Sequence, residues 1–529
     1  MSKELEYFSH KVARGLMDRR AFLGRAAALG VSSVVATGLL SSAAKAAGPM
    51  KGGTLKAGYQ GGASSDSLDS ALWASDAPIG FGRTWAEGLV EVGPTGEVEM
   101  RLAESVEASA DAKTWNFKIR EGVEFHNGKT LTPEDVVATI ERHSDENSKS
   151  GALGIVKGIE KVAADGQNVV ITLSEPNADL PYLMADYHLM IMPNGGKDDP
   201  TAGIGTGAYK IAENDPGVRS VGTRFENYWD ADNRGHADTV EVVVLNDSTA
   251  RLAALQSGQV HMINRVEPKV VDLVKRVPGV EVHSVSGRGH YVFIMHVNTA
   301  PFDNNDLRMA LKYAINRQEM VDKILNGYGS VGNDFPINAS YPLFPEGIEQ
   351  RSYDPDKAKF HYKKSGHDGP IVLRTSDVAF PGAVDAAQLF QQSAAAAGIN
   401  LDIKREPGDG YWSEVWNVKP FCASYWGGRP VQDQMYSTAY LSSADWNDTK
   451  FFRPDFDKII IEARGELDPV KRKELYRAAA LMVRDEGGLI LPMFNDFLDG
   501  VSDKVGGYED DSNGGLMNDK ALVKAWVKA

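Results

Sequence analysis

The residues best suited to hold a small molecule are aromatic side chains and one arginine near the middle of the C-terminal half. Trp426 is followed directly by two glycines, Arg429 and a proline. This order predicts a stiff loop that another molecule can approach closely. A guanidinium there can bind a carboxylate through two parallel hydrogen bonds, and indole rings can stack on flat or apolar groups. The residues expected at this site are Trp412, Trp426, Gly427 and Arg429, with Tyr411 at its rim.

These residues also have ordinary explanations. Each tryptophan is equally well explained by core packing, and a loop arginine is often a solvated surface residue. Four of the nine tryptophans nevertheless fall between positions 412 and 446. Because ligands of open α/β sheets bind where strands end in loops, this clustering favours a ligand site.

The common signatures of catalysis are missing. The sequence has no Walker A loop, no G-x-S-x-G elbow and no H-E-x-x-H motif, and its glycine-rich turn at 203–207 lacks the dinucleotide spacing. The 11 histidines are scattered and Cys422 is the only cysteine, so the sequence supports neither a disulfide framework nor a cysteine metal cluster. We therefore expect a protein that is not an enzyme and has no metal site and no cofactor.

Length and charge narrow the classes of function that this chain can have. The chain has 529 residues, enough for several domains, and a formal net charge of −15. Residues 47–529 carry 50 basic and 69 acidic side chains. Because an acidic surface repels phosphate backbones, no nucleic-acid partner is expected.

The first 46 residues have the three-part layout of an export signal. Arg19 and Arg20 are followed by x-Phe-Leu, which resembles a twin-arginine signal, and a weakly apolar stretch at 26–40 precedes Ala44-Lys45-Ala46. The apolar run of about 15 residues is shorter than the roughly 20 that a membrane-spanning helix needs. We therefore predict a twin-arginine signal peptide over 1–46, cleaved near Ala46/Ala47, and a mature protein in the periplasm.

The rest of the chain alternates strands with helices, which is typical of α/β domains. Thr132 and Pro133 predict the start of a helix, and Asp468 followed by Pro469 predicts another that runs to about Glu486. Apolar residues at helical spacing predict a single helix over 306–326. Strands are expected at 240–245, 280–285, 291–297, 371–374, 399–404, 421–425 and 489–493.

Several stretches of the mature chain resemble the solute-binding proteins of dipeptide, oligopeptide and nickel ABC importers, known as family five. The most specific is the block from Lys113 to Gly128, which reads KTWNFKIREGVEFHNG. Others, in the family's order, are GGTL at 52–55, LAES at 102–105, LTPEDVV at 131–137, IGTGAYK at 204–210, NYWD at 227–230, ALQSGQV at 254–260 and AINR at 314–317. The resemblance covers essentially the whole mature chain.

The resemblance implies an α/β fold of the type II periplasmic-binding-protein class, cluster C, with two lobes, a hinge and an inserted extra domain. Lobe I is expected to comprise 47–88, 203–298 and 490–529. The inserted domain II is expected at 89–202, and lobe II, also called domain III, at 299–489. The ligand would be enclosed between the lobes by hinge closure.

The resemblance also suggests which residues meet the ligand. Dipeptide binders of the family carry an arginine for the peptide carboxylate and an aspartate for the amino terminus in lobe II, and these positions fall near Asp377 and Arg429 here, with the charges exchanged. We therefore expect an anionic ligand group near Arg429 and a cationic or donor group near Asp377. Backbone donors are expected from Gly61 and Gly62. The cleft rim is expected to include Tyr187, His188 and Asp433.

The sequence thus favours a monomeric periplasmic protein that captures a peptide-like or amino-acid-derived ligand, such as an opine, for the permease and ATPase subunits of an ABC importer. A nickel ligand is disfavoured because no His/Cys cluster marks the expected cleft. Two alternatives remain at this stage, an exported peptide-binding sensor or chaperone and a hydrolase on the same scaffold.

Overall fold

The computed structural model describes Phe22, Ala26 and residues 48–145, 148–377, 379–408, 411–444 and 446–528, with Trp412 and Ser413 described by their backbone only. Nearly all of the predicted signal over 1–46, and its cleavage site near Ala46/Ala47, lie outside these residues. That signal stays a prediction. No helix in the described part of the chain is both long enough and apolar enough to cross a membrane.

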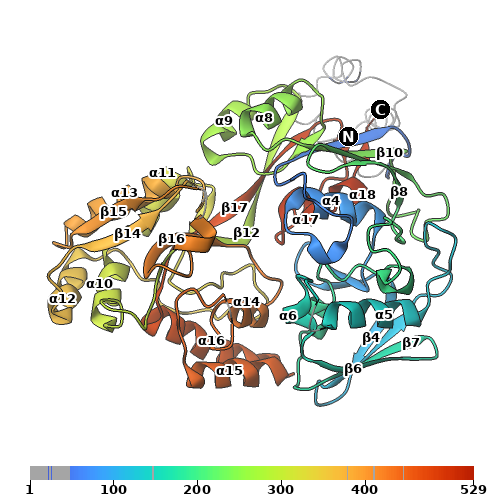
Figure 1. The fold of residues 1–529 in the computed structure, drawn as a ribbon. Helices are drawn as coiled ribbons and strands as arrows, with labels where there is room; N and C mark the ends of the chain where they lie inside the picture. The colour runs from blue at the N-terminus through green and yellow to red at the C-terminus, as the bar shows by residue number, and fades with distance from the viewer. Residues whose placement is uncertain are drawn as a thin grey trace.

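An 11-stranded sheet runs through both lobes and joins them (Figure 1). Its strand order is β15-β14-β16-β12-β17-β11-β1-β10-β9-β8, with β13 added beside β17. The two long strands at its centre, β12 (Val280–Met295) and β17 (Leu489–Ser502), pair antiparallel and pass from one lobe to the other. Their pairing shifts between Ser286 and His290 and again between Tyr291 and Phe293, so an irregular stretch interrupts the pairing near the middle of the two strands.

Lobe I is built around β1 (Thr54–Tyr59), which pairs in parallel with β10 and β11. The helix α4 (Asp76–Trp85) packs against the β10 side of this sheet. The other elements of lobe I are β8 (Tyr209–Asp215), β9 (Arg219–Arg224), β10 (Thr239–Val244), β11 (Met262–Ile263), β18 (Val505–Gly506), β19 (Trp526–Val527), α8 (Ser248–Gln256), α9 (Val271–Val274), α17 (Gly515–Asp519), α18 (Ala521–Lys524), η1 (Ser70–Leu72) and η3 (Pro268–Val270).

The predicted inserted domain has an antiparallel sheet of its own, in the order β4-β5-β7-β6, and a separate apolar core. Its main helix, α5 (Pro133–Ser144), begins after Thr132 as predicted, and the Thr132 N–H donates to Asp135 Oδ2 at 3.1 Å. Its other elements are β2 (Val90–Val92), β3 (Val98–Met100), β4 (Ala103–Ala108), β5 (Thr114–Ile119), β6 (Ile159–Asp165), β7 (Asn168–Leu173), α6 (Leu153–Val156), α7 (Leu180–Leu183) and η2 (Pro193–Gly196).

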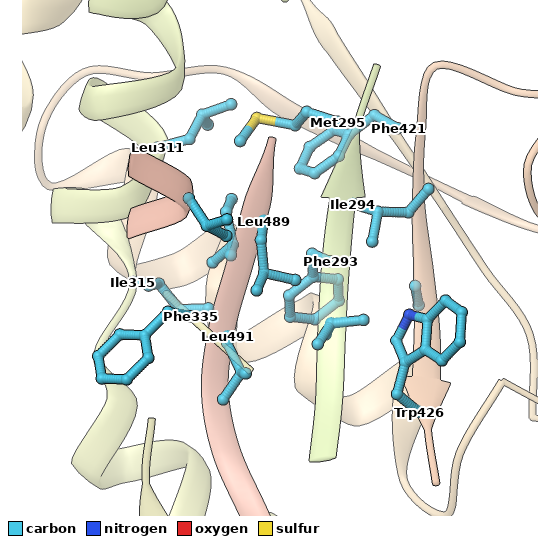
Figure 2. Close-up of a cluster of buried hydrophobic side chains, with 14 of the residues drawn as sticks. Phe293, Ile294, Met295, Leu311, Ile315, Phe335, Phe421, Trp426, Leu489 and Leu491 are labelled. Atoms are coloured by element: carbon cyan, nitrogen blue, oxygen red, sulfur yellow. The ribbon is translucent and has the colours of Figure 1, made fainter. Parts of the chain in front are cut away.

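Lobe II packs helices against β14 (Ile371–Thr375), β15 (Leu401–Arg405), β16 (Phe421–Trp426) and the ends of β12 and β17. Figure 2 shows part of its core, in which Phe293 and Leu489 come from the two crossover strands and Leu311 and Ile315 from the helical side. The helices are α10 (Asn305–Ala314), α11 (Arg317–Ile324), α12 (Pro355–Ser365), α13 (Ala383–Ala395), α14 (Gln432–Ala439), α15 (Pro454–Gly465) and α16 (Pro469–Glu486), with a short π turn η4 (Tyr411–Val415) and β13 (Gly329–Val331).

Two elements differ from the prediction for identifiable reasons. The single helix expected over 306–326 is wrong, because Ile315 is extended and Asn316 caps a second helix by accepting from the Glu319 N–H. The strands expected at 280–285 and 291–297 are one strand, because β17 pairs on both sides of the irregular stretch. The predicted lobe boundaries at 298/299 and 489/490 stay predictions.

Candidate ligand-binding site

Arg429 lies on a short loop that follows β16 and rests against the crossover strand β12. A Cβ atom on Gly428 would come within 2.3 Å of Arg288 Cβ, so only glycine allows this approach. The Arg429 N–H donates to the Tyr341 hydroxyl at 3.2 Å, and its Nη1 donates to the carbonyls of Gly427 and Gly428 at 3.1 and 3.2 Å. Among the described residues, no carboxylate lies within ion-pair distance of this guanidinium. Its charge is therefore available to an anion.

The positive charge of Arg429 affects the pKa values of two residues in the turn Asp186–His188 of the inserted domain. Burial alone would raise the pKa of Asp186, but its hydrogen bonds with His188 and the positive charge of Arg429 lower it below its usual value. Burial and the Asp186 charge raise the pKa of Tyr187 to about 12, and Arg429 opposes this increase. Arg429 thus acts electrostatically on Tyr187, although the two were predicted from separate parts of the sequence, and their roles in ligand binding stay predictions.

His188 has a different place from the cleft rim that we predicted. Its Nδ1 lies 2.6 Å from Asp186 Oδ1 and its Nε2 lies 2.8 Å from the Trp73 carbonyl oxygen. The Ser70 hydroxyl donates to the His188 carbonyl oxygen at 2.7 Å. The ring is buried and both nitrogens are engaged, so His188 fastens the inserted domain to the 70–73 segment of lobe I.

The predicted backbone donors of Gly61 and Gly62 are already used within the protein. Both N–H groups donate to Asn246 Oδ1, at 2.9 and 3.4 Å. The Asn246 side chain in turn donates to the Gly62 carbonyl oxygen at 2.9 Å. Since each residue has one N–H group, this loop has no backbone donor left for a ligand at these two positions.

Asp377 follows β14, the strand next to β16, but its carboxylate forms an ion pair with Arg405. Both side chains are about two-thirds exposed, at 67% and 66%. Asp433 is buried and accepts from Arg464 Nε at 3.1 Å, close to the contact between lobe II and the inserted domain. Neither carboxylate is brought together with Arg429 by an ion pair, and their ligand roles stay predictions.

Three tryptophans form one cluster in lobe II. The ring centroids of Trp416, Trp426 and Trp446 lie 5.9 to 6.2 Å apart in edge or tilted contacts. Trp426 is nearly buried, whereas Trp446 is 51% exposed. Trp446, which the prediction omitted, is therefore the most exposed indole of this cluster. Tyr411 is buried and donates to the Ala423 carbonyl oxygen at 2.7 Å, and the Trp412 side chain lies outside the described part.

A buried carboxyl group lies beneath this cluster. Asp448 Oδ2 accepts from the indole N–H groups of Trp416 and Trp426 at 2.9 and 3.1 Å, and its Oδ1 is buried with no hydrogen-bond partner among the described residues. Burial raises the pKa of Asp448 to about 7, although both indole N–H groups lower it. The folded protein therefore retains this proton at pH values where an unfolded chain has lost it.

Asp448→Asn should remove one pH dependence of stability. The raised pKa stabilises the folded state fully below about pH 4, and this contribution is lost as the pH rises to about 7. The wild-type free energy of unfolding should therefore fall relative to the variant across this window, by at most about 1.4 kcal/mol per pH unit. Urea unfolding at several pH values between 4 and 8 measures the difference, and parallel curves for the two proteins would contradict the assignment.

An ion pair of lobe I, between Arg265 and Asp76, was not among the predicted site residues. Arg265 donates from Nε and Nη2 to the two carboxylate oxygens of Asp76 at 2.9 and 3.0 Å. Burial lowers the pKa of Arg265, but Asp76, Tyr425 and Asp519 raise it above the usual value. Tyr425 lies on β16 in lobe II and is half exposed, so its electrostatic effect on Arg265 acts between the lobes. Only the three-dimensional fold places these distant residues together.

Comparison with known proteins agrees with this architecture. The family model "Bacterial extracellular solute-binding proteins, family 5 Middle" matches residues 97–448. Heme-binding protein A of Haemophilus influenzae is 25% identical over 458 residues, which cover 78% of this chain and 82% of that protein. Glutathione-binding protein GsiB of Shigella flexneri is 25% identical over 424 residues, which cover 76% and 82%. The structure of AgaA from A. tumefaciens in complex with agropinic acid is 23% identical, with a TM-score of 0.77 over 90% of this chain and 99% of that chain.

The likeness to solved periplasmic binding proteins confirms the predicted fold class, which is the mixed α/β fold of type II binding proteins with several domains. The family consists of solute-binding proteins that act outside the cytoplasm, and its name describes binding rather than catalysis. Because the family model matches more than half of its length, the chain belongs to the bacterial extracellular solute-binding proteins of family 5.

Proposed function

We propose that this protein is the periplasmic substrate-binding component of an ABC importer and that it captures a peptide-like or amino-acid-derived compound, such as an opine or another conjugate, between its lobes. Membership of the family supports solute capture. The ligands named for a relative and for a structural neighbour, glutathione and agropinic acid, are both amino-acid derivatives. The observation that carries the ligand class is the Arg429 guanidinium, which has no carboxylate partner in the described chain and whose positive charge lowers the pKa of Asp186.

Hinge closure would occur where β12 and β17 change lobes. At this point Arg288 Nη2 donates to the Ser340 carbonyl oxygen of lobe II at 2.8 Å, and its Nη1 donates to Asn513 Oδ1 of lobe I at 2.5 Å. Rotation about the irregular stretch at 287–289 would move the lobes with little change inside either core. A ligand that contacts both lobes binds the closed form better and so shifts the population toward it.

The closed protein would then present its ligand to the permease, while the ATPase drives transport. Enclosure removes water from around Arg429, which strengthens its attraction for a ligand carboxylate. No bond of the ligand needs to be made or broken in this cycle. We propose that the protein acts as a monomer, with the lobes themselves forming the complete site.

The proposal is tested by identifying what the mature protein carries. Protein isolated from the periplasm is denatured, and the released compounds are identified by mass spectrometry. We expect an amino-acid derivative with at least one carboxylate. Returning that compound to ligand-free protein should reduce the radius of gyration in X-ray scattering, and the compound should be recovered unchanged.

Three results would count against the proposal. A co-purifying compound without any anionic group would contradict the proposed role of Arg429 in binding a ligand carboxylate. Scattering that is identical with and without the compound would exclude closure around it. Chemical conversion of the compound by the purified protein would favour a hydrolase on this scaffold instead.

A further inference from the structure

One face of α4 in lobe I carries polar groups whose bonding capacity is only partly used. Asp76, Gly80 and Arg83 are spaced four and three residues apart, so they lie on the same face of the helix. Asp76 pairs with Arg265, which interacts with Tyr425 across the lobes. The Tyr59 ring end lies directly over Gly80, where an added Cβ would be 2.5 Å from the hydroxyl oxygen. This face therefore runs from the Asp76–Arg265 ion pair to Arg83.

Arg83 is a half-buried arginine with no acidic partner. Its Nε is buried and makes no hydrogen bond, and no carboxylate in the described chain lies within ion-pair distance of its guanidinium. Its positive charge nevertheless acts to lower the pKa values of Tyr187, Asp519 and Lys520. Because a buried donor without a partner is costly, a guanidinium with an unbonded Nε is more consistent with binding an anion than with stabilising the fold.

A left-handed turn places Asp519 beside this face. Leu516, Met517, Asn518 and Asp519 all have positive φ angles, between 46° and 61°, although none of them is glycine. Such backbone is unfavourable by roughly 1–3 kcal/mol per residue and is found mainly at functional sites. The buried carboxylate of Asp499 holds the turn by accepting from the Leu516 N–H at 2.6 Å. Figure 1 shows α17 next to α4, on the side of lobe I that faces the crossover strands.

Asp519 on α17 and Arg83 on α4 belong to elements that contact each other, and no ion pair joins the two residues. No cation in the described chain lies within 4.0 Å of the Asp519 carboxylate. Burial and the nearby carboxylates of Asp76 and Asp499 raise the pKa of Asp519, while Arg83 and Arg265 oppose this. The buried Tyr59 hydroxyl lies close to Asp519 without a hydrogen bond of ordinary geometry. A bound ammonium group would favour the ionised carboxylate and offset this cluster of negative charge.

We propose that Arg83 and Asp519 form a head-group subsite in lobe I, where Arg83 binds the carboxylate and Asp519 the ammonium of a free α-amino-acid group of the ligand. This inference rests on the proposed function and narrows its ligand class. Arg83 and Arg429 both oppose the increase in the pKa of Tyr187, and we place that ring between the head group and the anion bound by Arg429. The ligand is then an amino-acid conjugate with a zwitterionic head and a second, distant anionic group.

Three probe compounds distinguish what the two ends of such a ligand contribute to binding. γ-Glutamylglycine has the zwitterionic head and the distal carboxylate, N-acetyl-γ-glutamylglycine lacks the ammonium, and alanylalanine lacks the third charged group. Isothermal titration at pH 7 on ligand-free mature protein should show binding of γ-glutamylglycine and at least about 30-fold weaker binding of the N-acetyl form. Arg83→Gln should weaken the binding of γ-glutamylglycine by a similar factor. Arg83→Lys should weaken it less, because lysine keeps the positive charge and lacks only the guanidinium fork. Asp519→Asn should abolish the preference for the free amine over the N-acetyl form.

Arg276→Gln is the matched control, since it removes an exposed lobe I arginine outside the site and should leave binding unchanged. Circular dichroism and the melting temperature of each ligand-free variant establish that it is folded. If γ-glutamylglycine binds Arg83→Gln and Asp519→Asn as it binds wild type, while Arg429→Gln weakens it, the lobe I subsite is wrong and the proposed function stands. If wild type binds alanylalanine but not γ-glutamylglycine, the subsite is again wrong. If all three substitutions leave binding unchanged, or wild type binds none of the probes, both proposals fail.

Discussion

Asp334→Ala is expected to lower the free energy of unfolding of lobe II by about 3–5 kcal/mol, the largest stability effect that the structure predicts for one side chain. Asp334 is fully buried, and its carboxylate accepts from Arg317 Nη2 at 2.6 and 2.7 Å and from Arg351 Nη1 at 2.6 Å. It also accepts from the Leu491 N–H of β17 at 2.9 Å. Its removal leaves two buried guanidinium groups without their shared counter-charge. Urea unfolding followed by tryptophan fluorescence measures the loss.

Asp377→Ala is the matched control for this prediction, because it removes an aspartate of the same lobe that pairs with an arginine at the surface. Both members of that pair are about two-thirds exposed, so its loss should change stability by no more than about 0.5 kcal/mol. Equal effects of the two substitutions would show that burial does not decide the strength of the Asp334 cluster.

The same carboxylate should make the stability of the folded protein sensitive to acid over a defined pH range. Burial would raise the pKa of Asp334, but the charges of Arg317, Arg351 and Lys312 outweigh burial and lower it to about 2. Its contribution is therefore complete above the unfolded pKa near 4 and is lost as the pH falls toward 2. Wild type should lose stability over this range, whereas the Asp334→Ala variant should lack this part of the decline.

Local signals in the sequence predicted an element correctly where a local interaction determines its structure. Thr132 and Asp468 were correctly predicted to start helices, because a cap depends on residues within one turn. Asn316 carries the same kind of signal, with Glu319 three residues later, but the apolar spacing on both sides of it suggested one continuous helix. The crossover strand β12 was divided in two because its glycine-rich middle resembles a turn, and only its pairing with β17 keeps it continuous.

The candidate site was only partly visible for a related reason. Arg429 could be predicted because the glycines and the proline around it are adjacent in sequence. Arg83 and Asp519 could not be, because they are near opposite ends of the chain and meet only where α17 packs on α4. Conversely, Gly61 and His188 had suitable chemistry, but distant partners, Asn246 and Trp73, already occupy it. Residue type indicates what a group can bind, and the fold decides whether it is free to do so.

Arg429→Gln is expected to have the largest effect on binding. Removing one member of an enclosed charge pair typically costs about 2–5 kcal/mol, because the partner charge stays desolvated without compensation. The compound identified from the wild-type protein should therefore bind the variant roughly 30-fold to several thousand-fold more weakly in isothermal titration. The glutamine can still donate hydrogen bonds, so the loss reports the charge and the bidentate geometry rather than the volume of the side chain.

Arg405→Gln tests whether that loss is specific to the Arg429 loop. Arg405 belongs to the same lobe and ends β15, but it is exposed and already paired with Asp377. If Arg429 meets the ligand carboxylate directly, this control should bind as wild type does, and raising the salt concentration should weaken wild-type binding only modestly because the enclosed pair is poorly screened. A comparable loss in both variants, together with strong salt dependence, would instead indicate a diffuse attraction by the positive charges of lobe II. Unchanged affinity in Arg429→Gln would require the ligand anion to bind elsewhere, and Arg83 would then be the guanidinium best placed to hold it.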